Sequence, residues 1–354
     1  MACMAGSILK LLKTEPTPII TNNTATFVWK GRTAPALVGD FTGWDDGKPV
    51  RLVKSGAGVW TYQLALPADA YIEYAFLKGE ESLRDPLNPR LTPNGVGGYN
   101  NYFHMPGYKP TDLAGKYRQN PHGTLAQHIV RSEYFISGNH RTVYLYQPPG
   151  TERVPLVVVW DGQEYLHRVR LNYIVDNLIA PGRIRPVALA FVSNGGQKSR
   201  MGEYACNEAT LAFLMTEVLP LATKELNLLD IETFPGEFGV LGASMGGLMA
   251  LYTGTRIPHV FGKVLSQSGA FSWAGFDMVV FDLLERGEIR PLKIWMDVGI
   301  YDLPGLLVSN QRMQTLLTQR GYPLTYREYN AGHNYPAWRD DIWRGLEALY
   351  GFAK

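Results

Sequence analysis

The sequence has few cysteines and little net charge. Its 354 residues include only two cysteines, Cys3 and Cys206, which excludes a disulfide scaffold and any metal site built from several thiolates. Whether those two form one bond is left open by the sequence. Lysine and arginine number 34 against 32 aspartates and glutamates, a formal net charge of +2. A broad basic face needs a larger excess, so this balance disfavours a nucleic-acid partner or a polybasic membrane anchor.

Long apolar runs are also absent. A membrane-spanning helix needs about 20 apolar residues, and runs such as Pro155–Trp160 and Pro186–Val192 are far shorter. The N-terminal sequence MACMAGSILKLLKTEP has no charged start followed by a long apolar stretch and a small-residue cleavage site. We therefore expect a cytoplasmic protein without membrane contact. A chain whose signal had already been removed would have the same pattern.

Apolar and turn-forming residues are plentiful. Apolar residues make up 45% and charged residues 19% of the chain, enough for a large core and too apolar for a disordered protein. The length exceeds one ordinary domain of roughly 150 residues. The 37 glycines and 23 prolines indicate many turns. We therefore expect two folded domains with many short connections.

Residues 1–105 have an all-β pattern. Short segments rich in Val, Trp, Tyr, Phe and Leu are separated by Gly, Pro, Asp and Asn, and they cover Thr26–Trp29, Ala36–Val38, Val59–Leu66 and Ile72–Leu77. In Val59–Leu66 the larger apolar residues recur at every second position, which points one face inward. Short strands with frequent turns predict a small β-sandwich. The polar residues 106–121 are typical of a linker.

Residues 122–354 have an α/β pattern. Nearly continuous apolar runs, suited to strands buried on both faces, alternate with helical stretches such as Glu208–Leu226 and Gly246–Arg256. The runs are Leu156–Trp160, Val187–Val192, Phe238–Leu241, Val264–Ser266 and Ile294–Val298. This alternation predicts a doubly wound, mostly parallel sheet.

The segment Gly242-Ala243-Ser244-Met245-Gly246 carries the strongest chemical signal. It is a G-x-S-x-G sequence with an apolar strand before it and a small-residue helix after it, which is the context of a nucleophile elbow. The serine of an elbow sits on a very sharp turn, where its neighbours have no room for bulky side chains. The turn aims the backbone N–H of Met245 at a developing oxyanion. The alternative is a tight structural turn between strand and helix.

A serine nucleophile needs a base and an acid, which follow it along the chain in this kind of fold. His333 is the expected base, because it lies in a loop between the strand Leu324–Tyr329 and a C-terminal helix. His259 comes too soon after the elbow helix to follow an acid-bearing strand. Asp302 follows the end of an earlier strand and is the expected acid, and Asp297 is its rival.

Other residues complete the expected pocket. The second oxyanion donor should follow an earlier strand, at the N–H of Gln163 or, less favoured, Gly162, since glycine lets backbone approach a substrate closely. The favoured interpretation of Arg200 and Glu203 is a salt-bridged pair. Alternatively, the planar guanidinium of Arg200 donates hydrogen bonds to an anionic or catecholate substrate. Trp338 either forms a wall of the pocket or anchors the C-terminal helix. No metal site is expected.

Five stretches of the second domain resemble the enterochelin-esterase-like branch of the α/β-hydrolases, of the esterase D type. They are Trp160-Asp161-Gly162-Gln163, Arg200-x-x-Glu203-x-x-Cys206-Asn207 with Glu217-Val218-Leu219-Pro220, Gly242–Gly247, Val298-Gly299-x-x-Asp302, and Gly332-His333 with Trp338-Arg339. The resemblance implies a Ser–acid–His esterase using Ser244, Asp302 and His333, with no cofactor. Siderophore esterases of this kind often have Glu at the acid position, so Asp302 departs from them and matches the wider family.

The first domain resembles the early-set, glycogen-binding-like, immunoglobulin-type β-sandwich. The resemblance is carried by the stretches 38–44, 58–60, 74–79 and 85–89. Glycan binders of this class use exposed aromatic residues and a lysine, for which Trp44, Trp60 and Lys78 are the nearest matches. Glycan contact is one interpretation. A structural or substrate-shaping role is favoured, because large aromatic side chains mostly serve cores.

Taken together, the patterns predict an α/β-hydrolase that cleaves carboxylic esters through an acyl-enzyme. The resemblance implies a small-molecule substrate, an aryl or siderophore-like (enterochelin-type) ester. A carbohydrate esterase of the feruloyl or acetyl-xylan type is the alternative. A catalytically silent glycan-binding protein is the second alternative. The oligomeric state is not encoded in these patterns.

Overall fold

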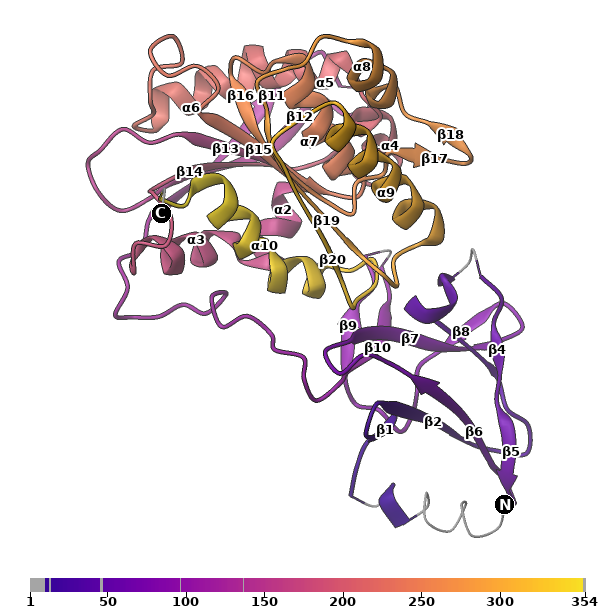
Figure 1. Cartoon of the computed structure of the whole chain (residues 1–354). Coiled ribbons are helices and arrows are strands. Elements are labelled where there is room, and N and C mark those ends of the chain that lie inside the picture. The colour runs from indigo at the N-terminus through magenta and orange to yellow at the C-terminus, as the bar shows by residue number, and fades with distance from the viewer. Residues whose placement is uncertain (1–9, 13, 45–46, 96, 136, 353–354) are drawn as a thin grey trace. The chain divides into compact units, whose positions relative to one another are not determined.

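The computed structural model describes residues 10–12, 14–44, 47–95, 97–135 and 137–352 (Figure 1). The chain divides into two compact units. The first contains residues 1–110 together with Gly299–Pro304 and Glu328–Ala337, and the second contains the remainder. Cys3 lies outside the described residues. Cys206 is buried, and burial raises the pKa of its thiol to about 12, which disfavours a nucleophilic role.

Two antiparallel sheets form most of the first unit. One has the strand order β1-β2-β6-β5, and the other has the order β4-β3-β7-β10-β9 with β8 beside β7. The strands are β1 (Ile19–Thr21), β2 (Thr24–Lys30), β3 (Ala36–Gly39), β4 (Val50–Arg51), β5 (Val53–Gly56), β6 (Val59–Ala65), β7 (Tyr71–Lys78), β8 (Glu81–Leu83), β9 (Leu91–Pro93) and β10 (Tyr99–His104). A single 3-10 turn, η1 (Asp40–Thr42), follows β3. The predicted strands of this region are confirmed at β2, β3, β6 and β7.

Aromatic side chains join the two sheets of the first unit. Phe27 of β2 is fully buried and meets Tyr74 of β7 edge-on, with ring centroids 4.9 Å apart. The ring centroid of Phe103 in β10 lies 5.6 Å from that of Phe27. Such tilted contacts are the favoured arrangement of aromatic pairs. Trp60 packs against this core and Lys78 is exposed.

An eight-stranded sheet runs through the second unit, in the order β11-β12-β14-β13-β15-β16-β19-β20. The strands β14, β13, β15, β16 and β19 pair in parallel, and β11 and β12 pair antiparallel at one edge. Their bounds are β11 (Thr124–Arg131), β12 (His140–Gln147), β13 (Leu156–Trp160), β14 (Ala188–Val192), β15 (Phe238–Ala243), β16 (Phe261–Gln267), β19 (Lys293–Gly299) and β20 (Leu324–Tyr329). The predicted α/β pattern with a mostly parallel sheet is confirmed. β13 and β14 are buried along their whole length, as their continuous apolar sequences predict.

Helices cover both faces of this sheet, with α3 and α10 on one face and α7 and α8 on the other (Figure 1). The helices are α2 (Gly162–Glu164), α3 (Leu171–Ile179), α4 (Gln197–Tyr204), α5 (Glu208–Phe213), α6 (Leu219–Glu225), α7 (Met245–Arg256), α8 (Val280–Arg286), α9 (Pro304–Gln319) and α10 (Tyr335–Tyr350). Two π-helical turns, η3 (Tyr165–Val169) and η4 (Leu214–Val218), and a hairpin of β17 (Ser272–Trp273) and β18 (Phe276–Asp277) complete it. In the part of the chain that the structure describes, no helix has the length and apolar character of a membrane span.

Candidate active site

Ser244 occupies a sharp turn between β15 and α7. Its backbone lies at φ 58° and ψ −123°, a conformation that side-chain-bearing residues rarely adopt and that is typical of strained functional turns. A Cβ at Gly242 would come 2.5 Å from the backbone of Gly246, so only glycine fits where the turn closes on itself. This geometry is that of a nucleophile elbow.

The end of β16 and the residues that follow it hold the strained serine in place. The N–H of Ser244 donates to the carbonyl of Gln267 at 2.9 Å, and the N–H of Ala270 donates to the carbonyl of Ser244 at 3.0 Å. Both bonds satisfy backbone groups that the sharp turn takes out of regular structure. The elbow is therefore fixed by its neighbouring strand as well as by its own glycines.

The candidate oxyanion donors follow two neighbouring strands. Met245 is the first residue of α7, and Gly162 and Gln163 begin α2 after β13. β13 and β15 pair directly in parallel, so these N–H groups follow the carboxyl ends of adjacent strands. Gly162 lies directly against β14, because a Cβ there would come 2.3 Å from the Phe191 carbonyl carbon. The helix N-terminus at Met245 also favours developing negative charge.

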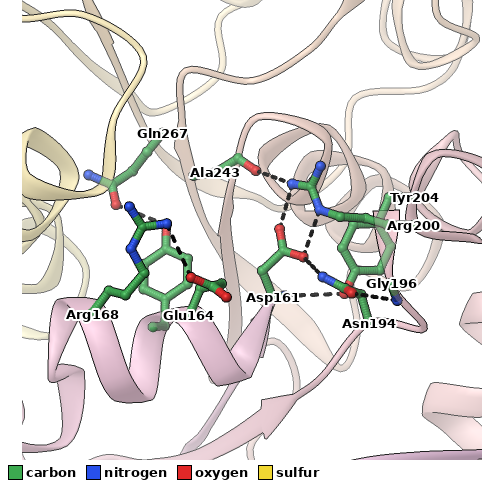
Figure 2. Close-up of polar contacts among 10 residues, drawn as sticks. Asp161, Glu164, Arg168, Asn194, Gly196, Arg200, Tyr204, Ala243 and Gln267 are labelled. Carbon is green, nitrogen blue, oxygen red and sulfur yellow. Dashed lines mark hydrogen bonds and ion pairs between the residues drawn. The ribbon is translucent and has the colours of Figure 1, made fainter. Parts of the chain in front are cut away.

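Asp161, between β13 and Gly162, is the hub of a buried polar network (Figure 2). Arg200 donates to its carboxylate through two nitrogens, with Nε 2.7 Å from Oδ1 and Nη2 2.6 Å from Oδ2. Asn194 Nδ2 adds a third donor at 2.6 Å. The N–H of Asp161 donates to the hydroxyl of Tyr204 at 3.1 Å. Because Asp161 itself has a positive φ of 54°, these contacts stabilise an otherwise unfavourable backbone conformation.

Arg200 connects this network to the nucleophile turn. Its Nη2 also lies 3.4 Å from the carbonyl oxygen of Ala243, the residue before Ser244 (Figure 2). On the other side of the turn, Gly246 faces the carboxylate, since a Cβ there would come 3.0 Å from Asp161 Oδ2. The Asp161–Arg200 pair thus braces the loop after β13 against the elbow after β15.

The expected pairing of Arg200 with Glu203 is wrong. Arg200 pairs with Asp161, and Glu203 pairs with Arg141 of β12. The Arg141–Glu203 pair is buried, whereas in the other pair Asp161 is buried and Arg200 is partly exposed. The partners are distant in sequence, since Arg141 lies on β12 and Asp161 directly follows β13. Sequence reasoning also missed Asp161 as a member of the site. The available signal was a carboxylate placed directly between an apolar strand and a glycine.

Trp338 lies in α10 and is buried, with 3% of its surface exposed. Its indole Nε1 donates to Ser268 Oγ at 3.1 Å, and its carbonyl accepts from Gln267 Nε2 at 3.2 Å. Both partners lie at the end of β16. This placement fits the helix-anchoring interpretation of Trp338 rather than that of a pocket wall.

Asp302 and His333 meet in the loops that follow β19 and β20. His333 Nδ1 lies 2.8 Å from Asp302 Oδ1, which also accepts the N–H of Leu303 at 2.7 Å. The Asp302 side chain is fully buried, whereas 21% of the His333 side chain is exposed. A carboxylate on Nδ1 fixes the tautomer with the proton on that nitrogen, so Nε2 is the basic one.

Asp297, the rival acid, has a different environment. It lies within the buried part of β19, and its Oδ2 accepts from Trp295 Nε1 at 2.8 Å and Gln267 Nε2 at 3.3 Å. Burial raises the pKa of this carboxyl well above its ordinary value, and the charge of Asp341 adds to the effect. Both of its hydrogen-bond donors are thus side chains of the sheet, and neither is a histidine.

His122, near the start of the second unit, has an acidic partner. Its Nδ1 lies 2.9 Å from Asp176 Oδ2, and Tyr146 donates to the other oxygen at 2.5 Å. Asp176 lies on α3, so the partner comes from the fold rather than from local spacing. Among the described residues, no three His, Cys, Asp or Glu side chains are grouped as they are in a metal site.

Comparison with known proteins places the chain in a family. The family model described as "Putative esterase" matches residues 135–349. The chain belongs to this esterase family. It is 30% identical over 229 residues to an iron(III) enterobactin esterase of Dickeya dadantii, which is 60% of this chain and 52% of that relative. It therefore spans about half the length of that esterase.

Solved structures of esterases share the fold. The enterobactin esterase of Shigella flexneri, determined in the presence of enterobactin, superposes with a TM-score of 0.76 at 23% identity, covering 96% of this chain and 97% of that one. A ferulic acid esterase of Anaeromyces mucronatus, in complex with ferulic acid, gives a TM-score of 0.55 at 16% identity, over 68% of this chain and 95% of that one. At these identities the likeness concerns the α/β-hydrolase-like fold alone.

The environment of Asp297 predicts a pH-dependent gain in stability for Asp297→Asn. The folded state keeps the proton on Asp297 where the unfolded carboxyl, with a pKa of about 3.9, has lost it. Wild-type stability therefore falls as the pH rises above that value, by up to about 1.4 kcal/mol per pH unit. Asparagine does not ionise, so the melting temperature of Asp297→Asn minus that of wild type should increase from pH 5 to pH 8.

Asp277→Asn is the matched control. Pairing with Arg312 and a hydrogen bond from Ser272 lower the pKa of Asp277, so this carboxyl is ionised in both states over that range. Its melting-temperature difference from wild type should stay constant between pH 5 and pH 8. A constant difference for Asp297→Asn as well would contradict the assignment of a protonated Asp297.

Proposed function

We propose that the protein is a serine carboxylic-ester hydrolase with the catalytic triad Ser244, His333 and Asp302. The observation that carries the proposal is the 2.8 Å contact between His333 Nδ1 and the buried Asp302. Together with a serine in elbow geometry, it supplies the three groups of acyl-transfer chemistry in the chain order typical of this fold.

Sheet topology supports a joint role for the three residues. Ser244 follows β15 and Asp302 follows β19, and both strands pair in parallel with β16. His333 follows β20, the neighbour of β19 in the sheet. In doubly wound α/β sheets, the loops after the carboxyl ends of the strands carry the site. The proposed triad therefore uses loops that this topology favours.

The proposed reaction runs in two halves. His333 Nε2 removes the Ser244 proton as Oγ attacks the ester carbonyl carbon, while Asp302 holds the imidazole and stabilises its positive charge. The N–H groups of Met245 and of Gln163, or of Gly162, stabilise the oxyanion. The intermediate expels the alcohol, which takes the proton from His333. Water then attacks the acyl-enzyme by the same route and releases the acid.

We also propose that the chain consists of an N-terminal β-sandwich, a linker and a catalytic domain. The two packed antiparallel sheets support an early-set, immunoglobulin-like sandwich over residues 1–105. Residues 105–123 contain no helix or strand, which supports a linker at 106–121 before a doubly wound catalytic domain at 122–354. The proposed glycan contact has less support, since Trp44 donates its indole N–H to Asp40 at 2.8 Å and Trp60 packs on the core.

The proposed substrate is a siderophore-like aryl ester of the enterobactin type. Support comes from the curated relative, an iron(III) enterobactin esterase, and from the shared fold of the enterobactin esterase determined with enterobactin. The ferulic acid esterase of similar fold is the observation that keeps a carbohydrate esterase as the second candidate.

Replacing the nucleophile should abolish catalysis. Ser244→Ala should lower kcat/KM for p-nitrophenyl esters by at least about 1,000-fold, with an unchanged circular dichroism spectrum. The wild-type protein should also be labelled at Ser244 by a fluorophosphonate probe. Activity retained in Ser244→Ala would refute the triad, and the absence of labelling would favour the silent glycan-binding protein.

Two matched aspartate variants should separate the acid from its rival. Asp302→Asn should lower kcat by about 1,000- to 10,000-fold, because the amide no longer stabilises the Nδ1-protonated tautomer and the imidazolium. Asp297→Asn keeps an oxygen for its two N–H donors and should stay within a few-fold of wild type. The reverse order of the two kcat values would make Asp297 the catalytic acid.

A substrate panel should identify the ester class. We expect kcat/KM to be at least tenfold higher for enterobactin than for methyl ferulate, acetylated xylan and p-nitrophenyl acetate, measured at one pH and temperature. The physical reason is that a matched acyl group is bound more tightly in the transition state than in the ground state. If methyl ferulate or acetylated xylan ranks first, the carbohydrate-esterase candidate replaces the siderophore one.

A further inference from the structure

Asp40 is a buried carboxyl next to the histidine loop, within the first unit. It begins η1, and it is held on both oxygens. Oδ2 accepts the backbone N–H of Glu73 in β7 at 2.8 Å, and Oδ1 accepts Nε1–H of Trp44 at 2.8 Å. Turning the carboxyl away would leave buried donors without an acceptor, which costs about 1–3 kcal/mol each. Asp40 is therefore a rigid group.

The Asp40 carboxyl lies directly against Gly332, the residue before His333. A Cβ at Gly332 would come 2.1 Å from Cγ and 2.3 Å from Oδ1 of Asp40. The φ of Gly332 lies outside the left-handed region, so its backbone conformation by itself accepts any residue. The three atoms nearest to such a Cβ all belong to the Asp40 carboxyl, so this carboxyl is the first obstacle to a side chain at position 332.

Further contacts attach both loops to the N-terminal strands. The N–H of Tyr71 donates to the carbonyl of Asn330 at 2.9 Å, and Asn330 Nδ2 donates to Asp69 Oδ1 at 2.6 Å. Tyr301, next to Asp302, packs on the core of the two N-terminal sheets. Strands from the first part of the chain thus hold the loops of the proposed acid and base.

Electrostatics also couple Asp40 to the histidine and its acid. The pKa of Asp40 is raised to about 7, chiefly by burial. The hydrogen bonds from Glu73 and Trp44 act in the opposite direction, and the charge of Asp302 raises the pKa while that of His333 lowers it. The three side chains therefore lie close enough to respond to one another's charge.

We infer that Asp40 is a positioning residue for the catalytic histidine. Its carboxyl fixes the path of the chain at Gly332 and so sets how the His333 imidazole meets Asp302. The inference rests on the proposed function, since the placement of His333 limits the rate only where His333 is the base. The N-terminal strands then have a defined catalytic task, which is to support the histidine loop.

A double-mutant cycle tests the contact. Gly332→Ala alone should displace the loop and lower kcat by about 100-fold with little change in KM, since small misplacements of reacting groups have effects of that size. Asp40→Ala alone should lower kcat less. In the double variant the new methyl group enters the space left by the carboxyl, so kcat should recover at least tenfold from the Gly332→Ala value.

A second readout does not depend on activity. The His333 Nδ1 proton, assigned in nitrogen-15-labelled protein by its loss in His333→Gln, reports the contact with Asp302. Its chemical shift should move in Gly332→Ala and return in the double variant. If that pattern appears although no ester is hydrolysed, the positioning stands and the proposed function fails. The inference is overturned if the losses of kcat in the two single variants multiply in the double variant and the His333 Nδ1 proton keeps its displaced chemical shift.

Asp85→Asn is the matched control, because Asp85 is another buried aspartate of the N-terminal strands. Its carboxyl accepts from Thr17 and Tyr74 at 2.6 and 2.7 Å and from the N–H of Leu87 at 2.8 Å. This variant should lower the melting temperature while leaving kcat and the His333 resonance unchanged. Should Asp40→Ala not fold, Asp40→Ser replaces it in the cycle, because serine also removes the carboxyl beside Gly332 and keeps a hydroxyl that is a hydrogen-bond acceptor. A change of kcat in Asp85→Asn equal to that in Asp40→Ala would overturn the inference.

Discussion

The close approach of Gly242 and Gly246 across one turn is the constraint on which the rest of the site depends. It forces Ser244 into a backbone conformation at φ 58° that is unfavourable for any residue with a side chain. Such a turn persists only where its surroundings over-determine it. Here β15 is buried along its whole length, and backbone hydrogen bonds to Gln267 and Ala270 secure both polar groups of the serine backbone. The buried parallel sheet is thus the precondition for the sharp turn that carries Ser244, the proposed nucleophile.

The loop after β13 also contains a residue in an unfavourable backbone conformation, and here side-chain contacts stabilise it. Asp161 also has a positive φ, and a two-pronged contact from Arg200 holds it there. A buried ion pair contributes little to stability, because desolvation offsets most of the Coulomb attraction. Its geometry is nevertheless specific, since the planar guanidinium fits one carboxylate orientation. The pair therefore contributes more to the relative placement of the loop after β13 and the turn at Ser244 than to the stability of the fold.

Local sequence predicts the elements of the fold and the strand–serine–helix turn, because apolar runs and glycine spacing act over a few neighbouring residues. It fails for polar partners. Arg200 and Glu203 are three residues apart on α4, yet their partners are distant in sequence. Arg200 pairs with Asp161, directly after β13, and Glu203 pairs with Arg141 of β12. These partners depend on strand order, in which β13 lies between β14 and β15 although β14 follows it in the chain. No local pattern encodes that order.

The contact between Asp40 and Gly332 also joins residues far apart in the chain, so local sequence does not predict it. The hydrogen bonds around Asp40 explain why a carboxyl occupies this position. An apolar side chain of similar size would fill the space beside Gly332 without the cost of burying an ionisable group. It would leave the N–H of Glu73 and the indole N–H of Trp44 without acceptors, however, and both point at this one side chain. The two donors contact different oxygens of Asp40, so an amide in the same position would turn an NH2 group toward one of them. Only a carboxyl satisfies both donors and stays rigid, and the raised pKa limits its repulsion of Asp302 below neutral pH.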